Sequence, residues 1–240
     1  MTIATPLEIG VLLVGEEVQF NDIAPADLLY MISPEFLVSL GPAVPPMQSL
    51  AVPMNISYIN EKGEGLFPLT AGAKIVVTHS LTTAPKLDIM IIPGTSADPT
   101  TRPAIDRFIK SAVAGGTAVL SICSGIFPTA ASGILDGLVA TAPLGVLSLV
   151  RERFPNVKWV SKCRWEKCGG AGGQGEIWTS GAVANGVDLT CEFMRQKFPE
   201  SRQLVDFMIA LSGIAERRRE YSMKEKIVEA MVEGERSPAQ

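Results

Sequence analysis

The segment from Thr117 to Gly137, TAVLSICSGIFPTAASGILDG, reads as a buried strand that turns at one cysteine into a helix. Residues 117–121 are mostly apolar and short enough for a parallel core strand, and apolar residues recur at helical spacing from Gly125 onward. This layout is typical of a nucleophile elbow. It therefore predicts an α/β fold in which Cys123 occupies the corner between strand and helix.

A thiol at such a corner projects above the edge of the sheet, where the amides of Ser124 and Gly125 are free at the helix start. These donors and the positive end of the helix dipole favour an anion, so we expect them to lower the pKa of the Cys123 thiol and to hold developing negative charge. A small core cysteine is the alternative, because free cysteines are among the most often buried side chains. The local pattern leaves both interpretations open.

Apolar runs alternate with helical patterns along most of the chain. Expected strands lie at 8–14, 54–59, 74–78, 87–92, 138–141, 157–160 and 177–180, and expected helices at 102–114, 144–154 and 181–197. This alternation predicts a three-layer α/β sandwich, with a mostly parallel sheet and helices on both faces.

The length of 240 residues, of which 47% are hydrophobic and 19% charged, suits one domain with a sizeable core. We expect that core to span 8–212, followed by a C-terminal helix over 214–233 and a frayed tail over 234–240. The arginine run at 217–219 is flanked by glutamates, which favours a solvated helix face.

A formal charge of -4 leaves no basic field, so nucleic acid and membrane surfaces are not expected partners. The chain shows no apolar run of transmembrane length and no signal peptide at MTIATPLEIG, which favours a cytoplasmic location. Four cysteines are too few for a disulfide scaffold and are expected to be thiols. Cys163 and Cys168 lack a second pair of cysteines or histidines, so no metal site is expected.

Three positions are candidates for the surroundings of the thiol. Asp22 follows the first strand, at the sheet edge where open α/β folds bind ligands, although a helix cap is the commoner role for such an aspartate. His79 is the only histidine, but it follows a different strand and is as compatible with a surface position. Gly94 lies in another loop at a strand end, where glycine lets the backbone approach a ligand closely.

Several segments together resemble the ThiJ/PfpI superfamily, with its class I glutamine-amidotransferase-like fold, and within it the isonitrile-hydratase-like branch. They are EIGVLLV followed by NDIAP, LDIMIIPG, AVLSICSG, ILDGLVATAP, the RW pair and IWTSGAVANGVDL. The resemblance spans roughly residues 8–212. It implies that Cys123 is a nucleophile with Asp22 as its acid–base partner, that the protein is a homodimer, and that it needs no metal or organic cofactor.

Two departures from the resemblance narrow the activity that it implies. Many relatives carry a histidine shortly after the elbow helix, where this chain has ATAP at 140–143, and a usual second glycine is replaced by Thr95. These changes argue against the glyoxalase and peptidase-like activities of the wider superfamily. Isonitrile-type chemistry remains open.

The resemblance implies a hydro-lyase acting on a small molecule, in which Cys123 adds to an electrophilic carbon and forms a thioimidate that water then attacks. Asp22 would be kept protonated by burial and by the neighbouring thiolate, and would donate the proton. The residues expected to stabilise charge or to line the pocket are Ser124, Gly94, Thr95, Thr179 and Ser180.

Two other functions are compatible with the same pair of residues. One is a non-catalytic redox-sensing or chaperone-like dimer in which Cys123 is oxidised and the acid is stabilised by Asp22. The other is a biosynthetic tailoring enzyme that uses the pair on another small electrophile.

Overall fold

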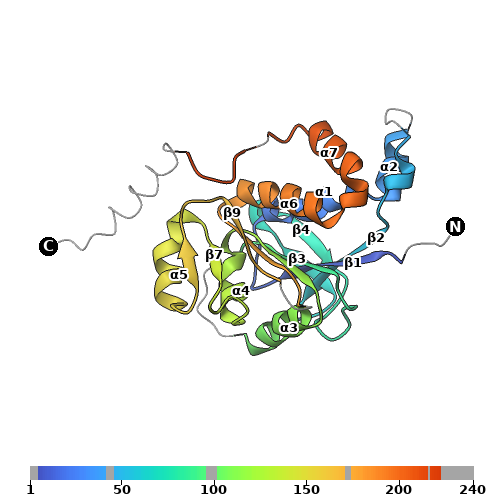
Figure 1. Ribbon diagram of the computed structural model, residues 1–240. Coiled ribbons are helices and arrows are strands. Elements are labelled where there is room, and N and C mark those ends of the chain that lie inside the picture. The colour runs from blue at the N-terminus through green and yellow to red at the C-terminus, as the bar shows by residue number, and fades with distance from the viewer. Residues whose placement is uncertain (1–4, 42–45, 96–101, 171–173, 216, 223–240) are drawn as a thin grey trace.

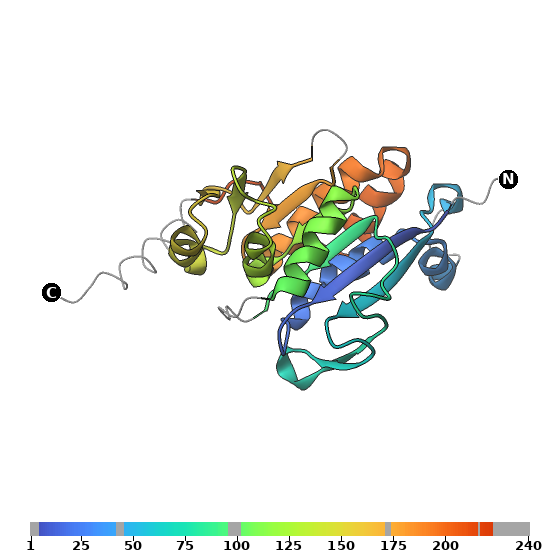
Figure 2. The same ribbon diagram turned by 90° about the horizontal axis from the view of Figure 1, so that it is seen from below.

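The computed structural model describes residues 5–41, 46–95, 102–170, 174–215 and 217–222, and its centre is a six-stranded sheet in the order β2-β1-β5-β6-β10-β9 (Figure 2). Neighbouring strands pair in parallel, except that β9 runs antiparallel to β10. The strands are β1 (Leu7–Leu13), β2 (Met54–Asn60), β5 (Ile89–Ile92), β6 (Ala118–Ser121), β9 (Trp165–Gly169) and β10 (Ile177–Ser180). The predicted, mostly parallel sheet is confirmed.

Helices cover both faces of this sheet (Figure 1). One face carries α1 (Ala24–Tyr30), α2 (Pro34–Leu40), α6 (Val183–Lys197) and α7 (Arg202–Leu211), and the other carries α3 (Pro103–Ala114), α4 (Ile126–Ala131) and α5 (Leu147–Arg153). Because successive strand residues point to opposite faces, β1 sends Ile9 and Val11 into one core and Leu12 into the other. The three-layer α/β sandwich is therefore also confirmed.

Three of the predicted strands lie outside the central sheet. β4 (Lys74–Val77) pairs with β3 (Gly65–Pro68) in a separate antiparallel ribbon, and β7 (Val139–Thr141) pairs in parallel with β8 (Lys158–Val160) in another two-stranded sheet. An apolar, β-branched run predicts a strand but not its partner, because pairing is decided by distant parts of the chain. β3 was not predicted, since its four residues are bounded by a glycine and a proline.

The predicted C-terminal helix over 214–233 is wrong in its described part, because residues 214, 215 and 217–222 are not helical. We call residues 217–222 the C-terminal strap. The strap lies in an extended course against the loop before β9, where Glu220 forms an antiparallel bridge with Cys163. These backbone bonds and the ion pairs of its arginines outweigh a helical propensity. Residues 223–233 and the tail at 234–240 lie outside the described residues.

Within the described part of the chain, no single helix has the length and apolar composition needed to cross a membrane. The segments Phe20–Tyr30 and Pro34–Leu40 meet those two criteria only when taken together, and they are bent by 87° relative to each other.

Candidate active site

Cys123 lies at the corner between β6 and α4, in a short 3-10 turn over Cys123–Gly125. Its φ angle is 53°, in the left-handed region that non-glycine residues rarely adopt. Such a conformation is strained and persists only where the surrounding structure holds it. Its side chain is half-buried on the sheet face that α6 covers. The predicted nucleophile elbow is therefore confirmed.

Two glycines let the neighbouring loops close around this turn. A Cβ atom on Gly125 would lie 2.1 Å from the carbonyl oxygen of Ile92, at the end of β5. A Cβ atom on Gly94 would lie 2.3 Å from Oδ2 of Asp22 and 2.9 Å from Oγ of Ser124. The distances of 2.1 Å at Gly125 and 2.3 Å at Gly94 are too short for any side chain, so glycine is required where the strand ends converge.

Asp22 is completely buried, in the segment between β1 and α1. Its Oδ2 atom accepts a hydrogen bond of 2.9 Å from the Gly94 amide, whereas Oδ1 is buried without a hydrogen-bond partner among the described residues. The helix α1 begins without any side-chain cap. The helix-cap interpretation of Asp22 is therefore wrong, and an unsatisfied buried carboxylate oxygen points to a functional role.

Asp22 and Cys123 shift each other's protonation. Burial raises the pKa of the Asp22 carboxyl from 3.8 to about 6, although the Gly94 amide and the Cys123 thiol act to lower it. Burial and the charge of Asp22 raise the pKa of the Cys123 thiol to about 11, against the lowering effect of nearby amides. At neutral pH the proton of the pair therefore lies on sulfur, and the carboxylate is mostly ionised.

Two predictions about this pair need correction. The lowered thiol pKa is wrong for the resting site, because burial and the neighbouring carboxylate outweigh the amides and the helix dipole. The raised carboxyl pKa of Asp22 is confirmed in direction, but a value of about 6 makes the carboxylate, and not the predicted acid, the main form at neutral pH. In this form Asp22 can accept the proton of Cys123, and it can donate a proton only after it has done so.

The amides that act on the sulfur come from two places. The Ser124 amide follows the elbow, and the Val183 amide is the first of α6, whose N-terminus has no side-chain cap. Ser180, at the end of β10, accepts the Cys123 amide at 3.4 Å and lies 3.4 Å from the Ser121 carbonyl oxygen. Ser180 and Ser124 thus lie beside Cys123, and their part in holding charge or lining the pocket stays a prediction.

Gly94 and Thr95 form hydrogen bonds with the residues around the elbow. The Gly94 amide is used by Asp22, and the Thr95 carbonyl accepts the Ser124 hydroxyl at 2.6 Å. The Thr95 hydroxyl donates to the Val14 carbonyl at 2.8 Å. These bonds position Asp22 and the elbow, and the part of the Gly94–Thr95 loop in holding developing charge stays a prediction. Residues 96–98, which follow Thr95 in this loop, lie outside the described residues.

Thr179 does not belong to this site. Its hydroxyl oxygen accepts the Thr141 amide at 3.0 Å and lies 3.4 Å from the Cys168 sulfur. Because residues alternate along a strand, Thr179 points to the face opposite to Ser180. The prediction that Thr179 lines the pocket is therefore wrong.

His79 lies away from the pair. Its ring Nδ1 is 2.9 Å from the Thr78 hydroxyl, and its carbonyl accepts the Asn60 amide at the end of β2. No hydrogen bond within the described part of the chain joins it to Cys123 or Asp22. The pair that the structure brings together is a cysteine and an aspartate.

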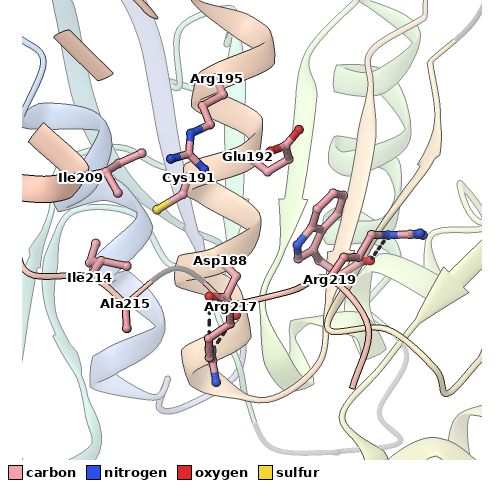
Figure 3. Close-up of a pocket in the computed structure, with 10 residues that line it drawn as sticks. Asp188, Cys191, Glu192, Arg195, Ile209, Ile214, Ala215, Arg217 and Arg219 are labelled. Atoms are coloured by element: carbon pink, nitrogen blue, oxygen red, sulfur yellow. Dashed lines mark hydrogen bonds and ion pairs between the residues drawn. The ribbon is translucent and has the colours of Figure 1, made fainter. Parts of the chain in front are cut away.

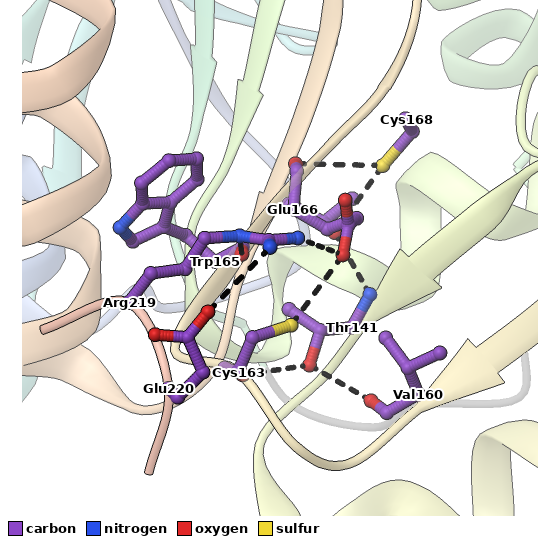
Figure 4. A network of polar contacts seen from close by, with 9 residues as sticks. Thr141, Val160, Cys163, Trp165, Glu166, Cys168, Arg219 and Glu220 are labelled. Carbon is purple, nitrogen blue, oxygen red and sulfur yellow. Dashed lines mark hydrogen bonds and ion pairs between the residues drawn. The ribbon is translucent and has the colours of Figure 1, made fainter.

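The other two cysteines near β9 surround one glutamate (Figure 4). The Cys163 thiol lies 3.5 Å from Oε2 of Glu166, which also pairs with Arg219, and the Cys168 thiol lies 3.6 Å from the Glu166 carbonyl oxygen. All four cysteines of the chain are free thiols, as predicted. In the described ranges, no group of three or more histidine, cysteine or acidic residues is placed to hold a metal ion.

A sequence profile described as the DJ-1/PfpI family matches residues 46–196, which is well over half of the chain. A comparison with curated proteins finds no match. Among solved structures, a ThiJ/PfpI family protein from Pseudomonas syringae aligns at TM-score 0.66 and 17% identity, covering 95% of this chain and 86% of that chain.

Two further structures show the same likeness. DJ-1beta from Drosophila melanogaster aligns at TM-score 0.65 and 14% identity over 88% of this chain and 100% of that chain. A putative transcriptional regulator from Vibrio parahaemolyticus aligns at TM-score 0.65 and 18% identity over 85% of this chain and 100% of that chain. At these identities the likeness concerns the fold alone.

Proposed function

The chain belongs to the DJ-1/PfpI family, and on this premise we propose that it is a cysteine-dependent hydro-lyase that adds water to the terminal carbon of isonitriles. The observation that carries the proposal is the buried carboxylate of Asp22 beside the Cys123 thiol on a strained elbow. One oxygen of this carboxylate is held by the Gly94 amide, and the other has no described partner. This arrangement supports a proton carrier that stays in place while the substrate changes.

In the first half of the reaction, Asp22 takes the proton of Cys123 as the sulfur adds to the isonitrile carbon. Addition leaves the lone pair of a carbanion on that carbon, and the protonated Asp22 returns the proton there. The product is a thioimidate in which the carbon carries one hydrogen and the sulfur of Cys123. The Ser124 and Val183 amides favour negative charge on the sulfur as the thiol gives up its proton.

In the second half, a water molecule attacks the thioimidate carbon and Asp22 accepts a proton from it. The protonated Asp22 passes this proton to the nitrogen of the former isonitrile. The tetrahedral adduct then collapses to an N-substituted formamide, and Asp22 carries its hydroxyl proton to the departing sulfur. The Cys123 sulfur leaves and regains its proton, so the sum is one isonitrile and one water giving one formamide. A carboxyl pKa of about 6 suits this alternation, because both protonation states are accessible near neutral pH.

A panel of alkyl and aryl isonitriles, with the formamide quantified by mass spectrometry, tests the proposal. We expect turnover by the wild type, none by Cys123→Ala, and a loss of at least about a hundredfold for Asp22→Asn, the scale of general acid–base catalysis. Absence of formamide from every isonitrile, with an intact fold, would refute the activity. Oxidation of Cys123 by peroxide to a stable sulfinic acid in that same sample would then favour the redox-sensing alternative.

The proposal also covers the oligomeric state, the cellular location and the cofactor requirement of the protein. We propose a homodimer that acts on a small molecule in the cytoplasm without a metal or organic cofactor. Its support is the resemblance to the isonitrile-hydratase-like branch and a net charge that disfavours nucleic-acid binding.

A further inference from the structure

The C-terminal strap, residues 217–222, is bound to the loop that precedes β9 by bonds of several kinds. The Arg164 guanidinium is buried, and its Nη1 donates to the carbonyl oxygens of Arg218 at 2.5 Å and Glu220 at 2.7 Å. The Arg164 amide donates to the Arg219 carbonyl at 2.7 Å. The Arg219 side chain pairs with Glu166 (Figure 4). The strap is thus fixed along its length.

Tyr221 is the buried anchor of the strap. Its side chain is only 8% exposed, its ring lies 5.2 Å from the Arg164 guanidinium carbon, and its amide donates to the Lys162 carbonyl at 3.0 Å. Its hydroxyl oxygen accepts a hydrogen bond of 2.8 Å from Nδ2 of Asn185. A Cβ atom on Gly181 would lie 2.4 Å from that oxygen, so the phenol also packs directly on the turn before α6.

Asn185 lies in the first turn of α6, and the strap binds both the nitrogen and the oxygen of its side-chain amide. Tyr221 binds its Nδ2, and Nη2 of Arg217 lies 3.3 Å from its Oδ1. The same guanidinium pairs with Asp188 on the next turn of α6 (Figure 3). Together, Tyr221 and Arg217 form a clamp on the beginning of this helix.

The clamped turn is the one that faces the elbow. Val183 precedes Asn185 by two residues, and its amide is near enough to the Cys123 sulfur to act against the rise of the thiol pKa. α6 also packs tightly on the elbow strand, because a Cβ atom on Gly186 would lie 2.5 Å from Cγ2 of Ile122. No side chain caps the start of this helix, so its position depends on packing and on the clamp.

We propose that Tyr221 is a positioning residue for the nucleophile: by binding Asn185 it holds the first turn of α6 against the elbow, with the Val183 amide beside the Cys123 sulfur. The strap thereby couples the C-terminal segment to the reactivity of the thiol. This inference rests on the proposed function for its catalytic meaning. Its test does not, because alkylation of the thiol requires no substrate.

The test is the pH dependence of Cys123 alkylation by iodoacetamide, followed by mass spectrometry of the peptide. Tyr221→Phe keeps the ring over Arg164 and removes the hydroxyl group that binds Asn185. Loss of a hydrogen bond to the thiolate raises the thiol pKa, and a rise of about one unit slows alkylation at neutral pH about tenfold. The charged group that faces the thiol is Asp22, and this substitution leaves it unchanged.

Two further variants make the result decisive. Asn185→Ala removes the clamped side chain itself, so it is expected to shift the alkylation profile in the same direction. Tyr30→Phe makes the same chemical change at the end of α1 and is expected to leave the profile unchanged. Thermal unfolding is measured for all three variants.

These measurements distinguish a positioning role of Tyr221 from a general loss of stability. A positioning role moves the alkylation profile of Tyr221→Phe and Asn185→Ala more than that of Tyr30→Phe at matched stability. An unchanged profile in Tyr221→Phe and Asn185→Ala, with or without a lower unfolding midpoint, would overturn the proposal. The result stands whether or not isonitriles are hydrated.

Discussion

At the scale of single residues, the site is a pair that shares one proton. The Asp22 carboxyl has a pKa of about 6 and the Cys123 thiol a pKa of about 11, so the two cannot readily be charged together. Burial is the main cause of both shifts. In the proposed mechanism the pair passes a proton from sulfur to carboxylate when an electrophile arrives, and at rest the raised pKa of the thiol disfavours a free thiolate.

Substitution of Asp22 by asparagine separates catalysis from folding. Asn keeps the size and an oxygen that accepts the Gly94 amide, but it carries no proton between sulfur and substrate. We expect Asp22→Asn to fold and to lose at least about a hundredfold in turnover of the best substrate. Wild-type turnover in Asp22→Asn, alongside an inactive Cys123→Ala, would show that the thiol exchanges its proton with water or substrate.

The same substitution has a pH-dependent effect on stability. The folded state binds the Asp22 proton more tightly than the unfolded state, whose carboxyl pKa is near 3.8, so this group favours folding at low pH. Its contribution falls as pH rises from about 4 to about 6, by up to about 3 kcal/mol. We therefore compare the unfolding free energy of Asp22→Asn with that of the wild type in urea titrations at two pH values. The difference, variant minus wild type, is expected to be larger at pH 7 than at pH 4. An equal difference at both pH values would contradict a raised carboxyl pKa.

The pH dependence of activity follows from the base role of Asp22. We expect kcat/KM to rise with pH through about 6 as the carboxylate forms, and to stay level to pH 8. Initial rates from pH 4.5 to 8 with the best substrate measure this. A decline of kcat/KM across the same range would mean that Asp22 must begin protonated.

At the scale of elements, the elbow depends on how closely β5 and the turn after β6 approach. Gly125 is the point of contact, because a Cβ atom there would lie 2.1 Å from the Ile92 carbonyl oxygen. Gly125→Ala is expected to lower the unfolding free energy by about 2–3 kcal/mol, the scale of overpacking, and to slow Cys123 alkylation. Gly145→Ala is the matched control, since a Cβ there meets no atom within 4 Å. Equal stability of the two variants would show that the elbow relaxes freely.

The position of each cysteine in the fold also decides which thiol reacts first, because it sets how far the thiol is buried. Cys163 is fully buried, and its thiol pKa of about 11 equals that of Cys123, so pKa alone does not select between them. Cys123 is half-buried in the turn between β6 and α4, so it is more accessible to a reagent than the buried Cys163 and Cys191. At limiting iodoacetamide we expect Cys123 to be labelled before Cys163 and Cys191. Faster labelling of Cys163 in the folded protein would contradict this order.

At the scale of the whole molecule, the sheet order explains why residues far apart in sequence meet. β1, β5 and β6 are adjacent and parallel, so their carboxyl ends share one edge and bring Asp22, Gly94 and Cys123 together. β10 lies beside β6 and delivers α6 to the same edge. The chain thus assembles its site from four consecutive strand ends of the sheet.

The assembly proposed for the whole molecule is a homodimer. Light scattering on the eluting protein at micromolar concentration is expected to give twice the chain mass of 25.6 kDa. Since the proposed mechanism uses residues of one chain, Cys123→Ala mixed with the wild type should lower activity in proportion to its share. A monomeric mass at this concentration would refute the dimer.

Local patterns in the sequence were sufficient for the layered fold, the elbow and the identity of its cysteine. Buried strands and amphipathic helices carry their period in the residues themselves, and a strand followed directly by a helix leaves little choice for the corner. Asp22 could be placed at the correct sheet edge from its position after β1. Its role there came from family resemblance, because an aspartate before a helix has the same local pattern as a cap.

Tertiary structure alone decided the protonation of the pair, the surroundings of Thr179 and the course of the strap. A pKa depends on burial and on charges brought together from distant segments, and neither is visible in a local pattern. The sequence near Arg217 favours a helix, yet Arg164, Glu166 and Asp188 bind the strap in an extended form. The physical reason is that many contacts with residues distant in sequence outweigh a propensity of a few tenths of a kcal/mol per residue.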